Sequence, residues 1–459
     1  MATVLPAETR HSVLVGLQEV PASSFVDATT NHDEYPWSYL TADTCPSTPP
    51  TSVSDCQTEI SRPSSPVRPD DQPIVAVLGV GYVGSHLVES FSKRYDVIGF
   101  DVSHARVRQL REDNAANASM EFTDNARNLS RATHFLISVP TLLRPDRTID
   151  SSYLREAIKT VGQVARRGST VVVESSVAVG MTRQLLGPLA QASGFFAGMS
   201  PERVDPGRVE PPVQAIPKII SGLDDVVPGS LDAIHRVYRT IFDNVVTVSK
   251  PEVAEMMKLY ENCQRMVCIA YANEMADACI SHDIDPYEVC SAASTKPFGY
   301  MPYAPGVGVG GHCIPVNPFY LLSNNSFPLL EAATSAMWSR PAKIADRALE
   351  SLRKLPKRSA KPRVLVAGMA FKAGQTSLSN SPGLDLAKSL AISQEAEVIW
   401  ADALVDQDAI PQIPRLADSE WTVEALETFD LIIVALKQRE MNFAVLNELR
   451  GTNVEMWCR

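Results

Sequence analysis

The stretch IVAVLGVGYVGSHLVESFSKRYDVIGFD (74–101) decides the fold that the sequence predicts. A short apolar run at 74–78 ends at a glycine, apolar residues then recur at helical spacing, and a second apolar run follows at 96–101. A strand, a helix and a second strand in this order predict a βαβ unit of a parallel sheet.

The loop GVGYVG (79–84) follows the first predicted strand at once and opens the helix. Gly79 permits a tight turn, Gly81 lets the backbone approach a pyrophosphate, and Gly84 allows close packing of helix on strand. Asp101 closes the second strand, where a carboxylate accepts hydrogen bonds from ribose hydroxyls and repels a 2′-phosphate. The pattern predicts NAD rather than NADP; the alternative is a glycine-rich turn beside an incidental surface carboxylate.

Composition limits the class of protein. The chain has 459 residues and a formal net charge of −11, which argues against a protein that grips nucleic-acid phosphates. The eight cysteines lack paired or zinc-type spacing, so neither a disulfide scaffold nor a metal site is expected. No secretory leader is recognised and no apolar run approaches 18 residues. We therefore expect a soluble cytoplasmic protein without membrane or nucleic-acid partners.

Changes in composition predict four parts of the chain. Between Thr41 and Asp70, 17 of 30 positions are Ser, Thr or Pro. This composition leaves too few apolar residues to form a core, so 1–72 is predicted to be a disordered tail. Further alternating strands and helices predict a dinucleotide-binding domain at 73–250. Long helices predict a helical domain at 251–355, and renewed alternation after PKRSAKP (356–362) predicts a second sheet domain at 356–459.

Two further segments carry polar or reactive groups in unusual settings. Lys258, Asn262 and Arg265 share one stripe of a predicted helix, which is either a solvated face or a face turned to a substrate. The segment TKPFGYMPYAPGVGVGGHCIPVNP (295–318) places five glycines and five prolines around Cys313. A thiol in such a loop can reach an electrophile, so we interpret Cys313 as functional rather than structural.

Motifs along about 73–440 resemble the UDP-glucose/GDP-mannose dehydrogenase family of nucleotide-sugar 6-dehydrogenases. They are VAVLGVGYVG (75–84), ESSVAVGMTRQLL (174–186), SPERVDPG (200–207), KLYENCQR (258–265) with IAYANE (269–274), the segment 295–318 around Cys313, and VLVAGMAFK (364–372). TKPFG and GGHCIP are more similar to the branch that oxidises UDP-N-acetylhexosamines than to the UDP-glucose branch.

The resemblance implies an α/β fold of two Rossmann-like, doubly wound parallel-sheet domains joined by a central helical domain that dimerises or forms a higher homo-oligomer. It also implies oxidation of the C6 alcohol of a UDP-sugar to a carboxylate with two NAD, through a thioester on Cys313. It assigns catalytic roles to Cys313, Lys258, Asn262, Glu202, Ser176 and Asn317. It assigns NAD contacts to Gly79, Gly81, Tyr82, Val83, Gly84, Asp101, Arg106, Pro140 and Ser176. It assigns substrate contacts to Arg203, Lys258, Asn262, Arg265, Lys296, Tyr303, Gly310, Phe371 and Lys372, and no metal.

Several positions depart from the family pattern, among them Ala178 and Met181 in the loop after the fourth predicted strand, and two departures bear directly on the chemistry. Asn317 stands where the family carries Asp, and an amide cannot act as a base. Ser379 stands where the family carries an Arg that would help to hold substrate. The sequence therefore leaves two alternatives to a UDP-N-acetylhexosamine dehydrogenase: a UDP-glucose 6-dehydrogenase, and a catalytically impaired homologue that binds NAD or nucleotide sugar.

Overall fold

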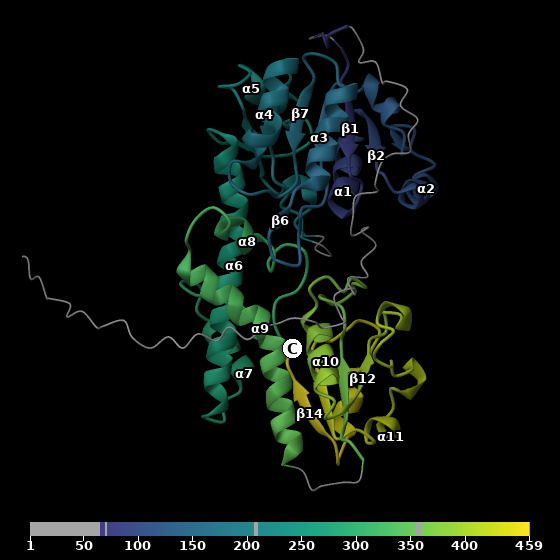
Figure 1. Ribbon diagram of the computed structural model, residues 1–459, viewed down its shortest axis with the longest axis vertical. Coiled ribbons are helices and arrows are strands. Elements are labelled where there is room, and N and C mark those ends of the chain that lie inside the picture. The colour runs from purple at the N-terminus through teal and green to yellow at the C-terminus, as the bar shows by residue number, and fades with distance from the viewer. Residues whose placement is uncertain (1–64, 69–70, 206–209, 355–359, 459) are drawn as a thin grey trace, which may run out of the picture. The chain divides into compact units, whose positions relative to one another are not determined.

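The computed structural model describes residues 65–68, 71–205, 210–354 and 360–458 (Figure 1). The predicted disordered tail lies almost wholly outside the described residues, as does much of the segment 356–362. Within the described part, the Val67 N–H donates to the Arg167 carbonyl over 2.8 Å, and Asp71 lies 3.4 Å from the Arg166 guanidinium. Contacts with the first sheet domain therefore begin before residue 73.

The first sheet has the strand order β10-β9-β8-β7-β4-β1-β2-β3. Its strands are β1 (Ile74–Leu78), β2 (Asp96–Phe100), β3 (Met120–Thr123), β4 (His134–Ile137), β7 (Thr170–Val173), β8 (Phe196–Met199), β9 (Lys218–Gly222) and β10 (Val245–Thr247). Its helices are α1 (Tyr82–Phe91), α2 (His104–Asp113), α3 (Ser152–Val164), α4 (Met181–Ser193) and α5 (Ser230–Tyr238). A short hairpin, β5 (Leu142–Leu143) and β6 (Ile149–Asp150), follows β4.

Side chains alternate across this sheet and give each face its own core. Ala76 and Leu78 of β1 lie in one core with residues of α3 and α4. Val75 and Val77 lie in the other core with residues of α1, α2 and α5. Because every second side chain of a strand points to the opposite face, one buried apolar run supplies both cores. The doubly wound α/β fold is confirmed.

Two strands run against the predicted direction. β9 pairs antiparallel with β8, and β10 pairs parallel with β9, whereas the other neighbouring pairs of this sheet are parallel. The sheet is therefore mixed, not wholly parallel. KIISG (218–222) has no feature that fixes its direction, because an apolar strand buried on both faces has the same pattern in either orientation.

The helical part consists of α6 (Pro251–Ile280), α7 (Pro286–Ser294), α8 (Asn317–Leu322) and α9 (Pro328–Arg353). Leu330 and Met337 of α9 share a core with Leu259 and Met266 of α6. The second half of α9 lies instead in a core with the second sheet. Helix α9 thus packs in the core of the helical domain and in the core of the second sheet domain. The predicted boundary between 355 and 356 therefore does not separate the two cores.

The second sheet has the order β12-β11-β13-β14, with every neighbouring pair parallel. Its strands are β11 (Arg363–Ala367), β12 (Glu397–Ala401), β13 (Leu431–Val434) and β14 (Asn453–Met456), and its helices are α10 (Pro382–Ser393) and α11 (Val423–Leu426). Val364 and Val366 face a core with α9 and α10, and Leu365 and Ala367 face the opposite core. This is the second Rossmann-like domain that the sequence predicts.

Candidate functional site

The loop between β1 and α1 has the geometry of a phosphate-binding turn. Gly79 has φ +87°, and its N–H donates to the Phe100 carbonyl over 2.8 Å. A Cβ on Gly84 would lie 1.8 Å from the Gly79 carbonyl oxygen, so only glycine permits this packing of helix on strand. A Cβ on Gly81 would meet no atom within 4 Å. Gly81 therefore faces the open space that an incoming pyrophosphate needs.

Asp101 and Arg106 hold this loop in place. The Asp101 carboxylate accepts the Val80 N–H over 3.0 Å and the Ser103 N–H over 2.9 Å. Arg106 donates to the Val80 carbonyl and to the Ser85 hydroxyl, each over 3.0 Å. Asp101 is half-buried at the end of β2, where a ribose would lie next to the loop.

Replacing Gly81 by alanine should separate binding from folding. The new methyl group meets no protein atom, so we expect an unchanged melting temperature but NAD binding weaker by about tenfold or more. The matched variant, Gly84→Ala, should lose about 1–3 kcal/mol of stability because its Cβ collides with backbone. Calorimetric titration with NAD and thermal melts measure both effects. Unchanged NAD affinity in Gly81→Ala would contradict this placement of the pyrophosphate.

The second sheet repeats the same turn in closed form. Gly368 has φ +88°, and a Cβ on Gly383 would lie 2.4 Å from its carbonyl oxygen. Asp402 accepts the Met369 N–H over 2.8 Å, as Asp101 does from Val80. Asp402, however, is 1% exposed and also accepts from the Gln438 amide. That carboxylate cannot receive ribose hydroxyls, so the open loop at 79–84 is the one suited to a dinucleotide.

The polar stripe of α6 is buried, which removes the interpretation of a solvated face. Lys258 is 7% exposed and Asn262 is fully buried. Arg265 donates to the Asn262 side-chain oxygen, and the Asn262 amide donates to Asn317 at the start of α8. These hydrogen bonds join three of the predicted site residues, Arg265, Asn262 and Asn317. Because Asn317 lies four positions after Cys313, they also connect α6 to the segment that carries the thiol.

Cys313 lies between α8 and the glycine-rich segment 306–311, within residues 306–316, which we call the thiol loop. Its carbonyl accepts the N–H groups of Val316 and Asn317, and its side chain is exposed. The loop is held from the second sheet domain, because the Gly311 N–H donates to the Ser379 carbonyl over 2.8 Å. A Cβ on Gly310 would lie 2.9 Å from the Cβ of Phe371, so the loop and the predicted substrate residue Phe371 are in close contact.

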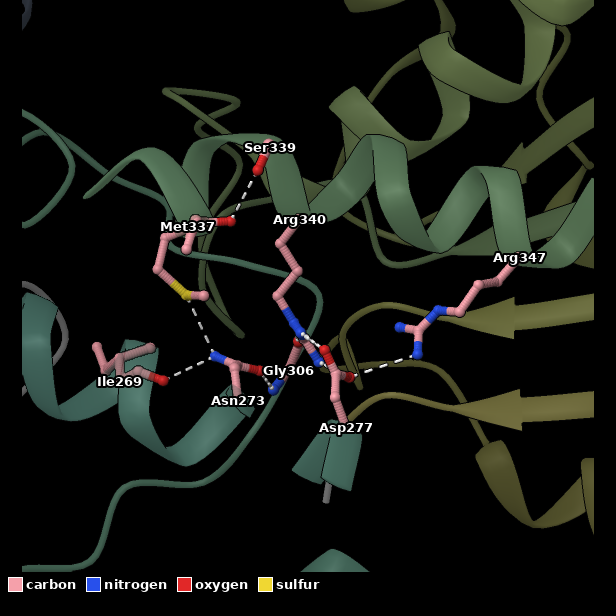
Figure 2. A network of polar contacts seen from close by, with 9 residues as sticks. Ile269, Asn273, Asp277, Gly306, Met337, Ser339, Arg340 and Arg347 are labelled. Carbon is pink, nitrogen blue, oxygen red and sulfur yellow. Dashed lines mark hydrogen bonds and ion pairs between the residues drawn. The ribbon is translucent and has the colours of Figure 1, made fainter. Parts of the chain in front are cut away.

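Hydrogen bonds from α6 and α9 fix Gly306, at the start of the thiol loop. Figure 2 shows Asn273 of α6 and Arg340 of α9 at Gly306. Asn273 accepts the Gly306 N–H over 2.9 Å, and Arg340 donates to the Gly306 carbonyl over 2.8 Å. Arg340 is itself fixed by two hydrogen bonds to Asp277, of 2.8 and 3.0 Å (Figure 2). Both polar groups of the Gly306 peptide are therefore satisfied before the loop reaches the thiol.

Glu202 lies in the loop after β8 and is fixed from three sides. Its carboxylate accepts the N–H of Arg203 over 2.7 Å, the N–H of Val204 over 2.9 Å and the Lys218 ammonium over 2.8 Å. Arg203 in turn pairs with Glu261 of α6 over 2.6 Å. The glutamate loop is thereby joined to the helix that carries Lys258.

The pKa of Lys258 responds to charged groups from other segments of the chain. Burial lowers the pKa of Lys258, and the neighbouring Arg265 adds to this effect, while Cys313 and Glu202 oppose it. The segments that carry Cys313 and Glu202 therefore both lie close enough to Lys258 for their charges to act on its ammonium. A buried ammonium next to an exposed thiol can stabilise an oxyanion formed on a bound carbon.

The other predicted residues lie around this cluster with different degrees of contact. The Thr141 hydroxyl, next to exposed Pro140, donates to the Ser176 carbonyl over 2.7 Å. Tyr303 is close enough to Arg265 for its pKa to be affected, although burial is the larger influence and raises it. Lys372 pairs with Asp205 over 3.0 Å.

Lys296 lies outside the hydrogen-bonded set of Arg265, Asn262 and Asn317. It is exposed, and its ammonium lies 4.9 Å from the centre of the Phe298 ring. Within the described ranges, no hydrogen bond or ion pair links it to Lys258, Asn262 or Cys313. Its assignment as a substrate contact rests on the family resemblance.

Three contacts were missed by sequence reasoning. His312 and Ser379 lie 2.9 Å apart through the ring Nδ1 and the hydroxyl, so the position that lacks the family arginine still contacts the thiol loop. Lys218 is buried against Glu202, and Arg340 is buried against Gly306. A lysine opening an apolar strand and an arginine inside a helix were the available signals, and neither specifies a partner.

Neither a metal site nor a membrane span is found in the described part of the chain. No group of three or more metal-ligating side chains comes together there, and no helix there is long and apolar enough to cross a membrane.

Comparison with known proteins places the chain among nucleotide-sugar dehydrogenases. Residues 74–242 match the NAD binding domain, and residues 252–335 the central domain, of the UDP-glucose/GDP-mannose dehydrogenase family. A UDP-N-acetyl-D-mannosamine dehydrogenase of Pyrococcus horikoshii is 32% identical over 371 residues, which are 75% of this chain and 87% of the relative. A UDP-N-acetyl-D-glucosamine 6-dehydrogenase of Pseudomonas aeruginosa is 34% identical over 340 residues, 69% of this chain and 80% of the relative.

Solved structures agree with this placement. The UDP-D-ManNAc dehydrogenase of P. horikoshii superposes with a TM-score of 0.73 at 27% identity, covering 84% of this chain and 99% of the other. A UDP-glucose dehydrogenase of Pyrobaculum islandicum, at 22% identity, shares the fold with a TM-score of 0.72 over 86% of this chain and 96% of the other. The chain therefore belongs to the UDP-glucose/GDP-mannose dehydrogenase family and is an NAD-dependent nucleotide-sugar dehydrogenase.

Proposed function

We propose that this protein oxidises the C6 alcohol of a UDP-N-acetylhexosamine to the carboxylate, through a thioester on Cys313. The observation that carries the proposal is the buried ammonium of Lys258, on which the charges of Cys313 and Glu202 act. It lies on the same helix as the hydrogen-bonded Asn262 that contacts Asn317. The substrate class is supported by the relatives, which are a UDP-N-acetyl-D-mannosamine dehydrogenase and a UDP-N-acetyl-D-glucosamine 6-dehydrogenase.

NAD bound at the open loop 79–84 supplies the hydride acceptor for both oxidations. In the first oxidation, a water held near Lys258 and Asn262 takes the alcohol proton. The Lys258 ammonium stabilises the oxyanion that develops at C6, and its burial strengthens this effect by excluding solvent. Ser176 in the loop after β7 and Arg265 next to Asn262 position this water and the sugar.

The Cys313 sulfur then bonds to the aldehyde carbon as the C=O π bond opens, and the thiol proton ends on the former carbonyl oxygen, which gives a thiohemiacetal. The second oxidation converts the thiohemiacetal to a thioester, which keeps the sugar on the protein between the two steps. Water attacks the thioester carbon, Glu202 takes the proton of that water, and the C–S bond breaks with its electron pair returning to sulfur. Asn317 hydrogen-bonds Asn262 rather than serving as a base.

The nucleotide and the rest of the sugar are assigned to residues around the thiol loop. These are Arg203, Lys296, Tyr303, Gly310, Phe371 and Lys372. We also propose a homo-oligomer built on the central helices, because Tyr260, Tyr271 and Met275 of α6 are exposed apolar residues that a second copy would cover.

The test of this function is NADH formation from a panel of UDP- and GDP-sugars. We expect UDP-N-acetylglucosamine or UDP-N-acetylmannosamine to give two NADH per uronate, and NADP to be a poor substitute because of the Asp101 carboxylate. Light scattering on the same sample gives the oligomer mass. Faster turnover of UDP-glucose would support the UDP-glucose 6-dehydrogenase instead.

Asn317 gives a test of the alternative in which the chain binds ligands without turning them over. Asn317→Asp restores a carboxylate that can accept the same Asn262 hydrogen bond, so we expect a folded variant whose turnover rises by about tenfold or more. Steady-state NADH formation measures the change, with Asn324→Asp, an exposed position beyond α8, as the control. A parent and an Asn317→Asp variant that are both inactive with every sugar would favour the binding protein.

A further inference from the structure

Lys218 is a buried lysine held between two buried carboxylates. Its side chain is 4% exposed, and its ammonium lies 2.8 Å from Glu174 and 2.8 Å from Glu202. The Tyr238 hydroxyl of α5 donates to the other oxygen of Glu174. An unpaired buried ammonium is costly, so a lysine at this place requires both partners.

The reversed direction of β9 explains how the lysine reaches this place. Glu174 directly follows β7, and Glu202 lies three residues after β8, so both carboxylates lie at the carboxyl ends of parallel strands. Because β9 runs antiparallel to β8, its first residue, Lys218, lies at this same edge. Ligands of open α/β sheets bind at that edge. The strand reversal thus delivers a cation to the edge where Glu202 lies.

The hydrogen bonds of Glu202 divide between its two oxygens. One oxygen accepts two backbone N–H groups, and the other accepts Lys218. Without Lys218, the second oxygen would have no partner among the described residues to fix its direction. The ammonium therefore holds the oxygen that the backbone N–H groups leave without a partner, and it balances the charge of the carboxylate.

The charges around the two carboxylates act unequally. Burial alone would raise the pKa of Glu202, but Lys218 and the backbone N–H groups outweigh it, so this pKa lies below its ordinary value. Burial raises the pKa of Glu174 despite the same ammonium. Lys258 of α6 and Tyr238 of α5 also lie close enough to Glu202 for their pKa values to respond to its charge, and the neighbouring Arg203 pairs with Glu261.

We propose that Lys218 is a positioning residue that orients the Glu202 carboxylate toward the water that cleaves the Cys313 thioester. This inference rests on the proposed function and deepens it, because it assigns the hydrolytic half of the reaction to a buried lysine that does not touch the substrate. Lys218 supplies neither atom nor proton to the reaction: Glu202 takes the proton of water, and the sulfur of Cys313 leaves with the electron pair.

The test compares Glu174→Gln with the double variant Glu174→Gln/Lys218→Met. The double variant removes one cation together with one carboxylate, so the buried net charge stays the same and folding is preserved where Lys218→Met alone would leave two unpaired carboxylates. Thermal melts and NAD titration confirm the fold of both variants. Lys218→Arg serves as the conservative variant, because it keeps a cation beside Glu202.

Two readouts report on Glu202. In the double variant, the pKa of Glu202 should rise, so the acid limb of the kcat profile should move upward by about one pH unit or more, and the sugar adduct on Cys313 should accumulate in mass spectra. Glu174→Gln and Lys218→Arg should keep the parent acid limb and show little adduct.

The outcomes separate the two proposals. The double variant could be active, with an acid limb of the kcat profile that coincides with that of Glu174→Gln and with no sugar adduct on Cys313. This result would overturn the role of Lys218 and leave the proposed function standing. A parent that forms no NADH with any UDP-sugar would overturn both.

Discussion

Replacing Cys313 by serine should reduce uronate formation by about 10³-fold or more, without loss of fold or NAD binding. Serine keeps the size of the side chain and leaves the Cys313 backbone contacts with Val316 and Asn317 in place. Its hydroxyl is a far weaker nucleophile than a thiol, so the aldehyde produced by the first oxidation cannot be captured and carried to the second. We expect about one NADH per sugar and an aldehyde that hydroxylamine traps.

Cys263, the buried cysteine of α6, cannot replace this thiol. Cys263 is buried in the core of α6, and burial raises its pKa to about 12, so it stays protonated and unreactive. Cys268→Ser, on the same helix, is the matched control and should keep the parent rate. Full uronate production by Cys313→Ser at the parent rate would show that no thioester forms on this residue.

The strands of the fold are predicted from sequence because their patterns are local. IVAVL, FDLIIVAL and RVLVAGMA each form a buried strand within a few residues of the expected ends, since an apolar run bounded by glycine or polar residues has few other stable conformations. The direction of β9 was not predictable. It depends on how the chain crosses the sheet between β8 and β9, which no residue of KIISG specifies.

The site residues also differ in how far the sequence predicts them, because some depend on local backbone geometry and others on contacts with distant segments. Gly79 and Gly84 have requirements set within one turn, and the structure shows the positive φ of Gly79 and the close packing of Gly84 that the sequence predicts. The burial of Lys258 and Asn262 depends on α8 and the thiol loop, which cover the α6 stripe from far along the chain. A helical periodicity shows which residues share a face and gives no information on what covers that face.

The departure at Ser379 shows how tertiary contacts change the interpretation of a substitution. From the sequence, a serine in place of the family arginine is only a loss. In the structure, its carbonyl accepts the Gly311 N–H, and its hydroxyl lies 2.9 Å from the His312 ring nitrogen, next to the thiol. The position therefore supports the loop that carries Cys313.

Replacing Lys258 by methionine should reduce NADH formation by about 10²–10³-fold in both oxidations. Methionine keeps the length of the apolar stem in a site where Lys258 is 7% exposed, so we expect the variant to fold and to bind NAD as the parent does. The cation is lost from the position where the C6 oxyanion develops. Arg265 cannot replace it, because its guanidinium is engaged with Asn262.

Supplying the sugar as alcohol or as aldehyde measures the two oxidations separately. Lys258→Met should be slow with both, whereas Cys313→Ser should be slow only beyond the aldehyde. Lys343→Met, at an exposed position of α9, is the control for removal of a lysine charge. Parent-like oxidation of the alcohol by Lys258→Met would remove Lys258 from the first step.

The pH profile of the parent provides a second check on Lys258. Burial lowers the pKa of this ammonium, so its charge is fully present at low pH and is lost as the pH rises through the lowered value. The alkaline limb of kcat should therefore fall at a pH below that at which an ordinary lysine titrates. In Lys258→Arg the side chain stays charged throughout this range, so the alkaline limb should move upward even where the rate is reduced. An alkaline limb that is identical in the parent and Lys258→Arg would assign it to another group and would contradict an essential ammonium at this position.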